Sequence, residues 1–183
     1  TTGVITAVEG NVLYIDTHLI RDYDSENNGK ITNAGSCISV LDDQNVFISD
    51  LTIDGNKTKN DLLDGCNGGG IVIIRSKGVI VERVHVKDFN GEGITWQITE
   101  DVTVRNCEIS GCTNMGLHPG SGSPKSVITG NNSHNNKVGL FICWRVHHGI
   151  VKDNSFHHNT DCGISTGHKD TDMLFDNNLI YEN

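Results

Sequence analysis

The stretch Gly93-Ile94-Thr95-Trp96 is one copy of a short pattern in which a glycine precedes an aliphatic residue at the start of an apolar run. The same pattern recurs at Gly70-Ile71, Gly116-Leu117, Gly139-Leu140 and Gly163-Ile164, at spacings of 23, 23, 23 and 24 residues. An earlier copy, Gly35-Ser36-Cys37-Ile38, lies 35 residues before Gly70, and a polar insertion that begins near Asp54 explains the extra length. A repeat at fixed spacing is the signature of a solenoid, in which each repeat packs on its neighbours.

An asparagine provides a second marker in each repeat. Asn106, Asn131, Asn154 and Asn177 are 25, 23 and 23 residues apart. Each follows one short β-prone run and precedes another. One repeat therefore reads strand, turn, strand, asparagine turn, strand and glycine-containing turn. This order predicts an all-β fold, a right-handed parallel β-helix of about six coils with about 23 residues per coil. The asparagines should stack, each amide bonding the backbone of the next coil.

Strand alternation predicts which side chains fill the core. The first residue after each glycine should point inward, and so should the third. The first set is Ile71, Ile94, Leu117, Leu140 and Ile164, and the second is Ile73, Trp96, Pro119, Ile142 and Thr166.

The composition agrees with many short strands joined by turns. The 183 residues include 21 glycines and 20 asparagines but only 2 prolines, and glycine and asparagine disfavour helix interiors. Leucine is not the recurring residue, which argues against leucine-rich repeats, and helical repeats require a period of about 3.6 residues. We expect residues 1–34 to lead into the β-helix and residues 35–183 to form it.

Charge and hydropathy exclude two classes of partner. The net charge of −9 argues against nucleic-acid binding, which needs a basic surface. No apolar run approaches the roughly 18 residues of a membrane span. An acidic protein can still bind a polyanion through a local basic cluster or a bridging cation.

The cysteines and histidines do not predict a metal site. The six cysteines contain no CxxC motif, and we interpret them as small core residues. His147-His148 and His157-His158 are adjacent pairs, whose side chains should point to opposite faces of a strand, so no set of residues has the spacing of metal ligands.

A family resemblance follows from these repeats. The runs Gly70-Ile71-Val72-Ile73 and Gly93-Ile94-Thr95-Trp96, with the asparagine-turn strands, resemble the parallel β-helix repeats of pectate-lyase-like proteins over residues 35–183. That superfamily includes polysaccharide lyases, glycoside hydrolases, uronan epimerases and phage tail proteins. The resemblance implies a polysaccharide partner and favours a secreted or cell-surface location. No capping helix is visible, so self-association through the solenoid ends is also expected.

Aligning the coils on their glycines identifies a candidate site on the outside of the helix. His118, Gln97 and Cys143 should lie close together on one face, with Trp144-Arg145 and His168-Lys169 beside them. Tryptophan suits the face of a pyranose and cations suit carboxylates, while a base can remove the proton next to a uronate carboxylate. We therefore predict a lyase or epimerase of an acidic polysaccharide. The catalytic residues are His118, Lys169, His168 and Arg145, and the substrate-binding residues are Trp144, Gln97, Asp170 and Asp172.

Two other functions stay open at this stage. The first is a glycan-binding or structural β-helix module without catalysis. The second is a glycoside hydrolase that uses Asp170 and Asp172, whose carboxylates are also candidate ligands for a Ca²⁺ cofactor. Each residue also has a simpler interpretation: His118 as a backbone-bonded strand end, Arg145 and Lys169 as solvated charges, and the aspartates as turn residues that bond their own backbone.

Overall fold

The computed structural model describes residues 5–10, 12–16, 26, 35–63, 65–66 and 68–183, and every regular element among them is a β-strand. Contacts divide the chain into two units, Thr1–Asn33 and Ala34–Asn183. In the first unit, β1 (Ile5–Glu9) pairs antiparallel with β2 (Val12–Ile15). Most of the predicted leading segment, residues 1–4, 11, 17–25 and 27–34, lies outside the described residues. Among the described residues, no helix is long and apolar enough to cross a membrane.

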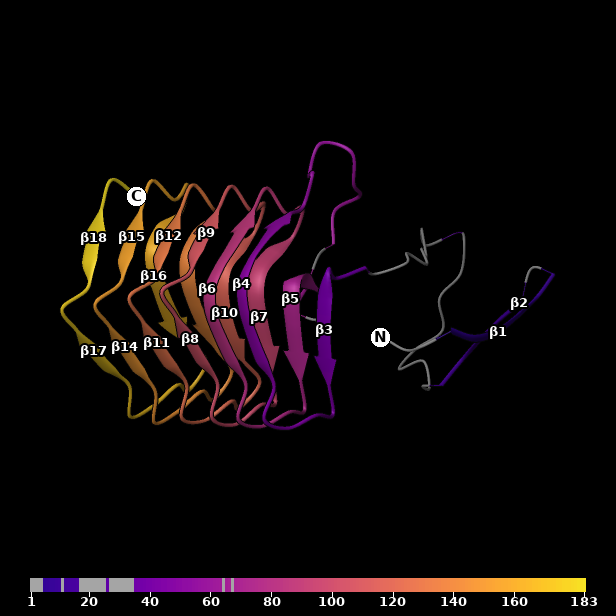
Figure 1. Ribbon diagram of the computed structural model, residues 1–183, viewed down its shortest axis with the longest axis horizontal. Helices are drawn as coiled ribbons and strands as arrows, with labels where there is room; N and C mark the ends of the chain where they lie inside the picture. Colours follow the sequence, from indigo (N-terminus) through magenta and orange to yellow (C-terminus); the bar gives the residue numbers. More distant parts are fainter. Residues whose placement is uncertain (1–4, 11, 17–25, 27–34, 64, 67) are drawn as a thin grey trace. The chain divides into compact units, whose positions relative to one another are not determined.

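The second unit is a stack of coils that confirms the predicted parallel β-helix (Figure 1). Its six-stranded sheet runs β16-β13-β10-β7-β5-β3 and has one strand from each coil. In chain order these strands are β3 (Ile38–Leu41), β5 (Gly69–Ile74), β7 (Glu92–Gln97), β10 (Met115–Gly120), β13 (Val138–Cys143) and β16 (Cys162–Gly167).

The other side of the solenoid is a ten-stranded parallel sheet. The long strands β4 (Phe47–Asp54) and β6 (Ile80–Lys87) each span the full width of this sheet. In each later coil two short strands take the place of one long strand. The change occurs next to β6, which pairs with β8 through its first half and with β9 through its second half. The first row contains β8 (Thr103–Arg105), β11 (Val127–Thr129), β14 (Ile150–Lys152) and β17 (Leu174–Asp176). The second row contains β9 (Glu108–Ser110), β12 (Asn132–His134), β15 (Ser155–His157) and β18 (Leu179–Tyr181).

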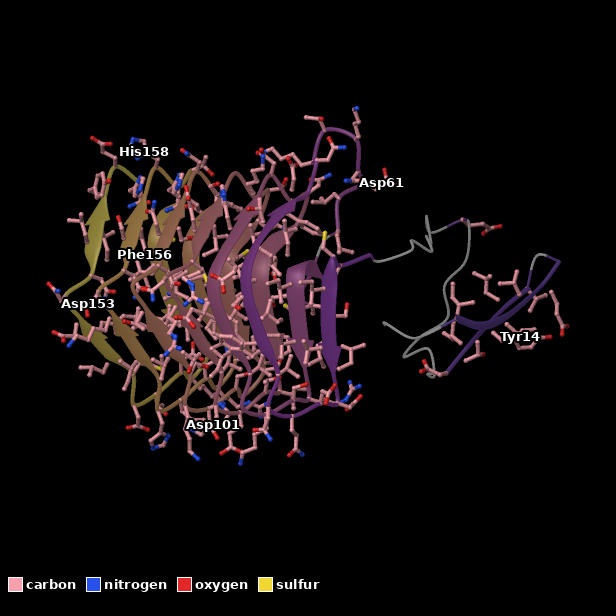
Figure 2. All side chains as sticks on the ribbon, in the orientation of Figure 1. Tyr14, Asp61, Asp101, Asp153, Phe156 and His158 are labelled. Atoms are coloured by element: carbon pink, nitrogen blue, oxygen red, sulfur yellow. The ribbon has the colours of Figure 1, made fainter. Side chains whose placement is uncertain are left out.

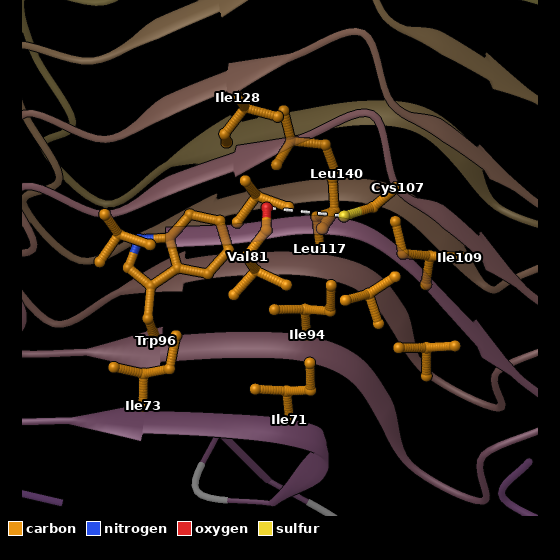
Figure 3. Close-up of a cluster of buried hydrophobic side chains, with 14 of the residues drawn as sticks. Ile71, Ile73, Val81, Ile94, Trp96, Cys107, Ile109, Leu117, Ile128 and Leu140 are labelled. Atoms are coloured by element: carbon orange, nitrogen blue, oxygen red, sulfur yellow. Dashed lines mark hydrogen bonds between the residues drawn. The ribbon is translucent and has the colours of Figure 1, made fainter. Parts of the chain in front are cut away.

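The register places equivalent residues of successive coils directly above one another. Ile38 pairs with Ile71, Ile71 with Ile94, Ile94 with Leu117, Leu117 with Leu140 and Leu140 with Ile164. The four aliphatic side chains from Ile71 to Leu140 are 0% exposed and form one stack in the core, with Ile73 and Trp96 beside it (Figure 3). The inward positions are confirmed in the middle coils. In the last coil Ile164 is only partly buried and Thr166 is exposed.

The repeating glycines are required because neighbouring coils approach closely there. A Cβ atom on Gly93 would lie 2.5 Å from the carbonyl oxygen of Gly116, and one on Gly139 would lie 2.5 Å from that of Gly163. Neither glycine has a positive φ. The left-handed turn positions are held mainly by other residues, among them Arg83, Asn106 and Asp153. The glycine series therefore marks backbone packing rather than left-handed turns.

The asparagine ladder exists, but it differs by one residue from the predicted series. The backbone N–H of Cys107 donates to Oδ1 of Asn131, that of Asn131 to Asn154, and that of Asn154 to Asn178. Predicting Asn106 and Asn177 as members was wrong. Both are exposed residues with φ values of 53° and 48°, at the left-handed position just before the ladder.

A second ladder, absent from the prediction, lies at the next turn. The N–H of Cys112 donates to Oδ1 of Asn136, that of Asn136 to Asn159, and that of Asn159 to Asn183. Asn136 and Asn159 are 1% and 2% exposed, so these amides satisfy backbone groups that water does not reach. The two ladders hold two of the turns of each coil in place, and these turns set the direction of the strands on either side.

The predicted geometry of the paired histidines is also corrected. His148 and His158 have φ values of 55° and 53°, so each lies at a left-handed turn position instead of within a strand. His158 follows β15, whereas His148 follows the isolated bridge residue His147 and precedes β14. The turn brings the two Nδ1 atoms of each pair to 2.7 Å, and the rings meet edge to face.

Candidate functional site

The outer face of the six-stranded sheet carries two of the predicted site residues, His118 and Gln97, together with Cys143. His118 pairs with Thr95 of the preceding coil, and Gly120 pairs with both Gln97 and Cys143. The prediction that His118, Gln97 and Cys143 lie on one face is therefore confirmed. Gln97 lies over Gly120, since a Cβ there would be 2.5 Å from Oε1 of Gln97.

His118 is on this outer face and yet is 2% exposed. Its Nδ1 lies 2.7 Å from Oε1 of Glu92, whose side chain is 3% exposed. The Phe141 ring of the next coil contacts the imidazole at a centroid distance of 5.1 Å. Nε2 of His118 and Oε2 of Glu92 are buried and have no hydrogen-bond partner. An unpartnered buried polar atom costs about 1–3 kcal/mol, which makes this pair unusual for a site whose only role is packing.

The loop between β4 and β5 reaches this pair from outside the sheet. Figure 1 shows the loop extending beyond the other turns, and Figure 2 shows Asp61 projecting from it. Leu63 of the loop packs against the core, while the hydroxyl of Thr95 donates to the carbonyl of Cys66 at 3.1 Å. One ligand-type atom from each of Cys66, Glu92 and His118 lies within 4.8 Å of the other two.

The insertion carries three aspartates, Asp54, Asp61 and Asp64. Asp54 forms an exposed ion pair with Lys87 at 2.9 Å, and Asp61 is exposed. Asp64 lies outside the described residues. The insertion does more than carry charge, because its Cys66 lies next to Thr95, Glu92 and His118 of the sheet.

A second group of selected residues lies at the turn after β13 and β16. The Trp144 ring is 57% exposed and stacks on His168 at 5.7 Å with an interplanar angle of 13°. Nδ1 of His168 also lies 3.3 Å from Sγ of Cys143. Burial raises the pKa of Cys143 to about 11, with the charges of Cys66 and Asp170 as smaller causes. The thiol is therefore protonated at neutral pH and can donate to His168.

Two cations flank this stack, as predicted. Arg145 and Lys169 are exposed and have φ values of 64° and 68°. The N–H of Arg145 donates to the carbonyl of His168 at 3.2 Å, so the backbone joins the two turns. Within the described part of the chain, neither side chain forms an ion pair.

The two aspartates of this region occupy different environments. Asp170 accepts hydrogen bonds from the N–H groups of Val146 and Gly167 at 2.9 and 3.0 Å, one on each carboxylate oxygen. Ser123 accepts from the backbone of the preceding coil at the corresponding turn, at 3.2 Å. Asp170 therefore serves as the acceptor of a turn ladder, whereas Asp172 is exposed at a left-handed position.

The cysteines only partly follow the prediction that they act as small core residues. Cys107, Cys112 and Cys143 are buried, and all three have raised pKa values because of burial. Cys37 and Cys66 are exposed, and Cys162 is intermediate. No disulfide joins the six cysteines in this structure.

Sequence reasoning did not select Glu92 or Cys66. Glu92 is the first residue of β7, and strand alternation would place its side chain on the inner face with Ile94 and Trp96. Cys66 belongs to the one long insertion between repeats, and the register of the repeats says nothing of where such a loop folds. An acid next to a marker glycine and a cysteine in that insertion were the signals available.

The fold and this outer face define a solenoid of the right-handed parallel β-helix class. The family model described as "Right handed beta helix region" matches residues 18–180, and the chain belongs to that family. A search of curated proteins returns no match.

Among solved structures, the chain is similar to the A-module of the mannuronan C-5 epimerase AlgE6 of Azotobacter vinelandii, with 16% identity and a TM-score of 0.43. The match covers 74% of this chain and 50% of that chain, so this chain spans about half the length of that module. No activity follows from this likeness.

Proposed function

We propose that the protein binds an acidic polysaccharide on its outer surface, with the Trp144–His168 stack as the platform for a sugar ring. The observation that carries this proposal is a tryptophan that is 57% exposed and yet held in place by a ring of the next coil. An exposed aromatic ring, preorganised by its neighbour, offers an apolar face to a pyranose at little entropic cost.

The two cations beside the platform account for an acidic polymer. Arg145 and Lys169 lie in equivalent turns of adjacent coils, and neither is neutralised by a described acidic side chain. Arginine in particular can bind a carboxylate through two parallel hydrogen bonds. The chain as a whole carries −9, so the attraction is local and should be weakened by salt.

This function is tested by measuring the binding of uronate oligosaccharides and neutral oligosaccharides, in the presence and in the absence of Ca²⁺. Trp144→Ala should weaken binding by roughly ten- to thirtyfold, which corresponds to about 1.4–2 kcal/mol. Ile98→Ala is the matched control, because Ile98 holds the same turn position two coils earlier, is 59% exposed and also has a positive φ. The proposal fails if no oligosaccharide binds, or if both variants bind as the unsubstituted protein does.

A second candidate is a lyase or epimerase of the same polymer, with His118 as the base. The observation in its favour is that Glu92 holds Nδ1 while Nε2 has no partner. Burial argues against it, since a polymer cannot reach an imidazole that is 2% exposed unless Phe141 or the loop moves. The geometry therefore favours binding over proton abstraction.

The two candidates differ in a direct assay. A lyase produces unsaturated uronate ends that absorb in the ultraviolet, and an epimerase exchanges the C5 proton with solvent deuterium. If the protein only binds, oligosaccharide should be retained with neither signal. Either signal, lost in His118→Ala, would establish the enzymatic alternative.

A further inference from the structure

The three side chains that meet under the β4–β5 loop have the chemistry of a metal site. Cys66 supplies a thiol, His118 an imidazole and Glu92 a carboxylate, and their ligand atoms lie within 4.8 Å of one another. We propose that Cys66, Glu92 and His118 bind a zinc ion, which fixes the β4–β5 loop to the outer face of the sheet. This inference concerns a site separate from the Trp144 platform and goes beyond glycan binding.

The unsatisfied polar atoms are an independent reason to place an ion here. Oε2 of Glu92 and Nε2 of His118 are buried without a hydrogen-bond partner. The two side chains are 3% and 2% exposed, so bulk water does not compensate them. A cation bound by this group would compensate the charge of the buried carboxylate.

The type of ligand selects zinc over calcium or magnesium. Calcium requires six to eight oxygen ligands and magnesium an octahedral set of oxygens, whereas this group has one carboxylate. A thiolate and an imidazole suit zinc, and three protein ligands leave the fourth tetrahedral position for water.

The geometry requires only a small closure. Zinc–ligand bonds of about 2.0–2.3 Å place tetrahedral ligands roughly 3.3–3.8 Å apart. The ligand atoms now lie within 4.8 Å of one another, which is within about 1–1.5 Å of that spacing. A metal on His118 would also remove this imidazole from any role as a base.

Metal content and cobalt spectroscopy test the site without any glycan. The protein is stripped with chelator under reducing conditions, loaded with Zn²⁺ and desalted, and zinc is measured by mass spectrometry. We expect one equivalent per chain. Loading with Co²⁺ should give thiolate-to-cobalt charge-transfer absorption and the visible bands of a tetrahedral ion.

The matched variants are Cys66→Ser and Cys37→Ser, because both cysteines are exposed and only Cys66 belongs to the site. Cys66→Ser should abolish the charge-transfer band and weaken zinc binding at least about tenfold, while Cys37→Ser should change neither. His118→Asn and Glu92→Gln should also lose zinc. Their circular dichroism spectra show whether they fold, and the two serine variants decide the matter if they do not.

Proteolysis gives a readout of the loop itself. Zinc should slow cleavage between β4 and β5 in the unsubstituted protein and have no effect in Cys66→Ser. The inference is overturned if the loaded protein retains no zinc, or if Cys66→Ser retains zinc and the cobalt band. Neither outcome affects the platform, because the Trp144 assay measures oligosaccharide binding and requires no zinc.

Discussion

The substitution Gly93→Ala tests whether close backbone approach explains the glycine series. The added methyl group would lie 2.5 Å from the carbonyl oxygen of Gly116 and 2.4 Å from Cγ2 of Ile109. Coil spacing is set by the parallel hydrogen bonds of the sheet, near 4.8 Å, so the backbone of the next coil cannot retreat without lengthening those bonds.

Overpacking of a core by one methyl group costs about 1–3 kcal/mol, and a clash with backbone belongs to the upper part of that range. We therefore expect Gly93→Ala to lower the free energy of unfolding by about 2–3 kcal/mol. For a protein of this size that is a fall in Tm of roughly 4–12 °C.

The control is Gly167→Ala, the same substitution at a glycine with no atom within 4 Å of the added Cβ and no positive φ. Its stability should be unchanged or raised by up to about 1 kcal/mol, because alanine restricts the unfolded chain. Urea unfolding followed by circular dichroism gives the midpoint and slope for each protein. A Gly93→Ala protein within about 0.5 kcal/mol of the unsubstituted one would refute the close-approach explanation.

Two further predictions concern the asparagine ladders and His157, whose ring stacks on that of His134 in the preceding coil at a centroid distance of 4.8 Å. Asn154→Ala removes an amide that is 2% exposed, accepts the N–H of Asn131 and donates to the carbonyl of Ile128. It should cost about 2–4 kcal/mol in urea unfolding, whereas Asn106→Gly, at the exposed turn position, should stay within about 0.5 kcal/mol; equal losses would contradict the corrected ladder. The pKa of His157 lies below its ordinary 6.5 because of burial first and then the neighbouring imidazoles, so its protonation opposes folding. That contribution is fully present above pH 6.5 and lost as pH falls through the lower folded pKa, so the Tm of the unsubstituted protein should fall more between pH 7.5 and pH 5 than that of His157→Gln.

The fold could be predicted because one constraint repeats. Gly93 and Gly139 have no room for a side chain, and the aliphatic residue after each must fill the core, so the same pair returns every 23 or 24 residues. The asparagine series was predicted less well. Asn106 and Asn131 look equivalent in the sequence, but one occupies the left-handed turn and the other the buried ladder one step later.

The candidate site was predicted only where the register determines it. The adjacency of Trp144 and His168 follows from counting residues within each coil, and the rings do stack. The burial of His118 could not be predicted from the register, because it depends on the side chain of Glu92 at the start of β7 and on the loop between β4 and β5. The role of Asp170 was also hidden, because only the structure shows that its carboxylate replaces the serine hydroxyl of an earlier coil.

The nearly constant register makes the length of this molecule a discrete quantity. Loss of a block of 23 residues, from Leu117 to Gly139 for example, would join Gly116 directly to Leu140 and place Leu140 against Ile94, and duplication of the same block would add one coil. Ladders and core would continue without a break, and the rod would change by one strand spacing of about 4.8 Å. Such a chain can gain or lose whole coils during evolution. Each added coil brings a new set of outward side chains, while the pattern of core residues is unchanged.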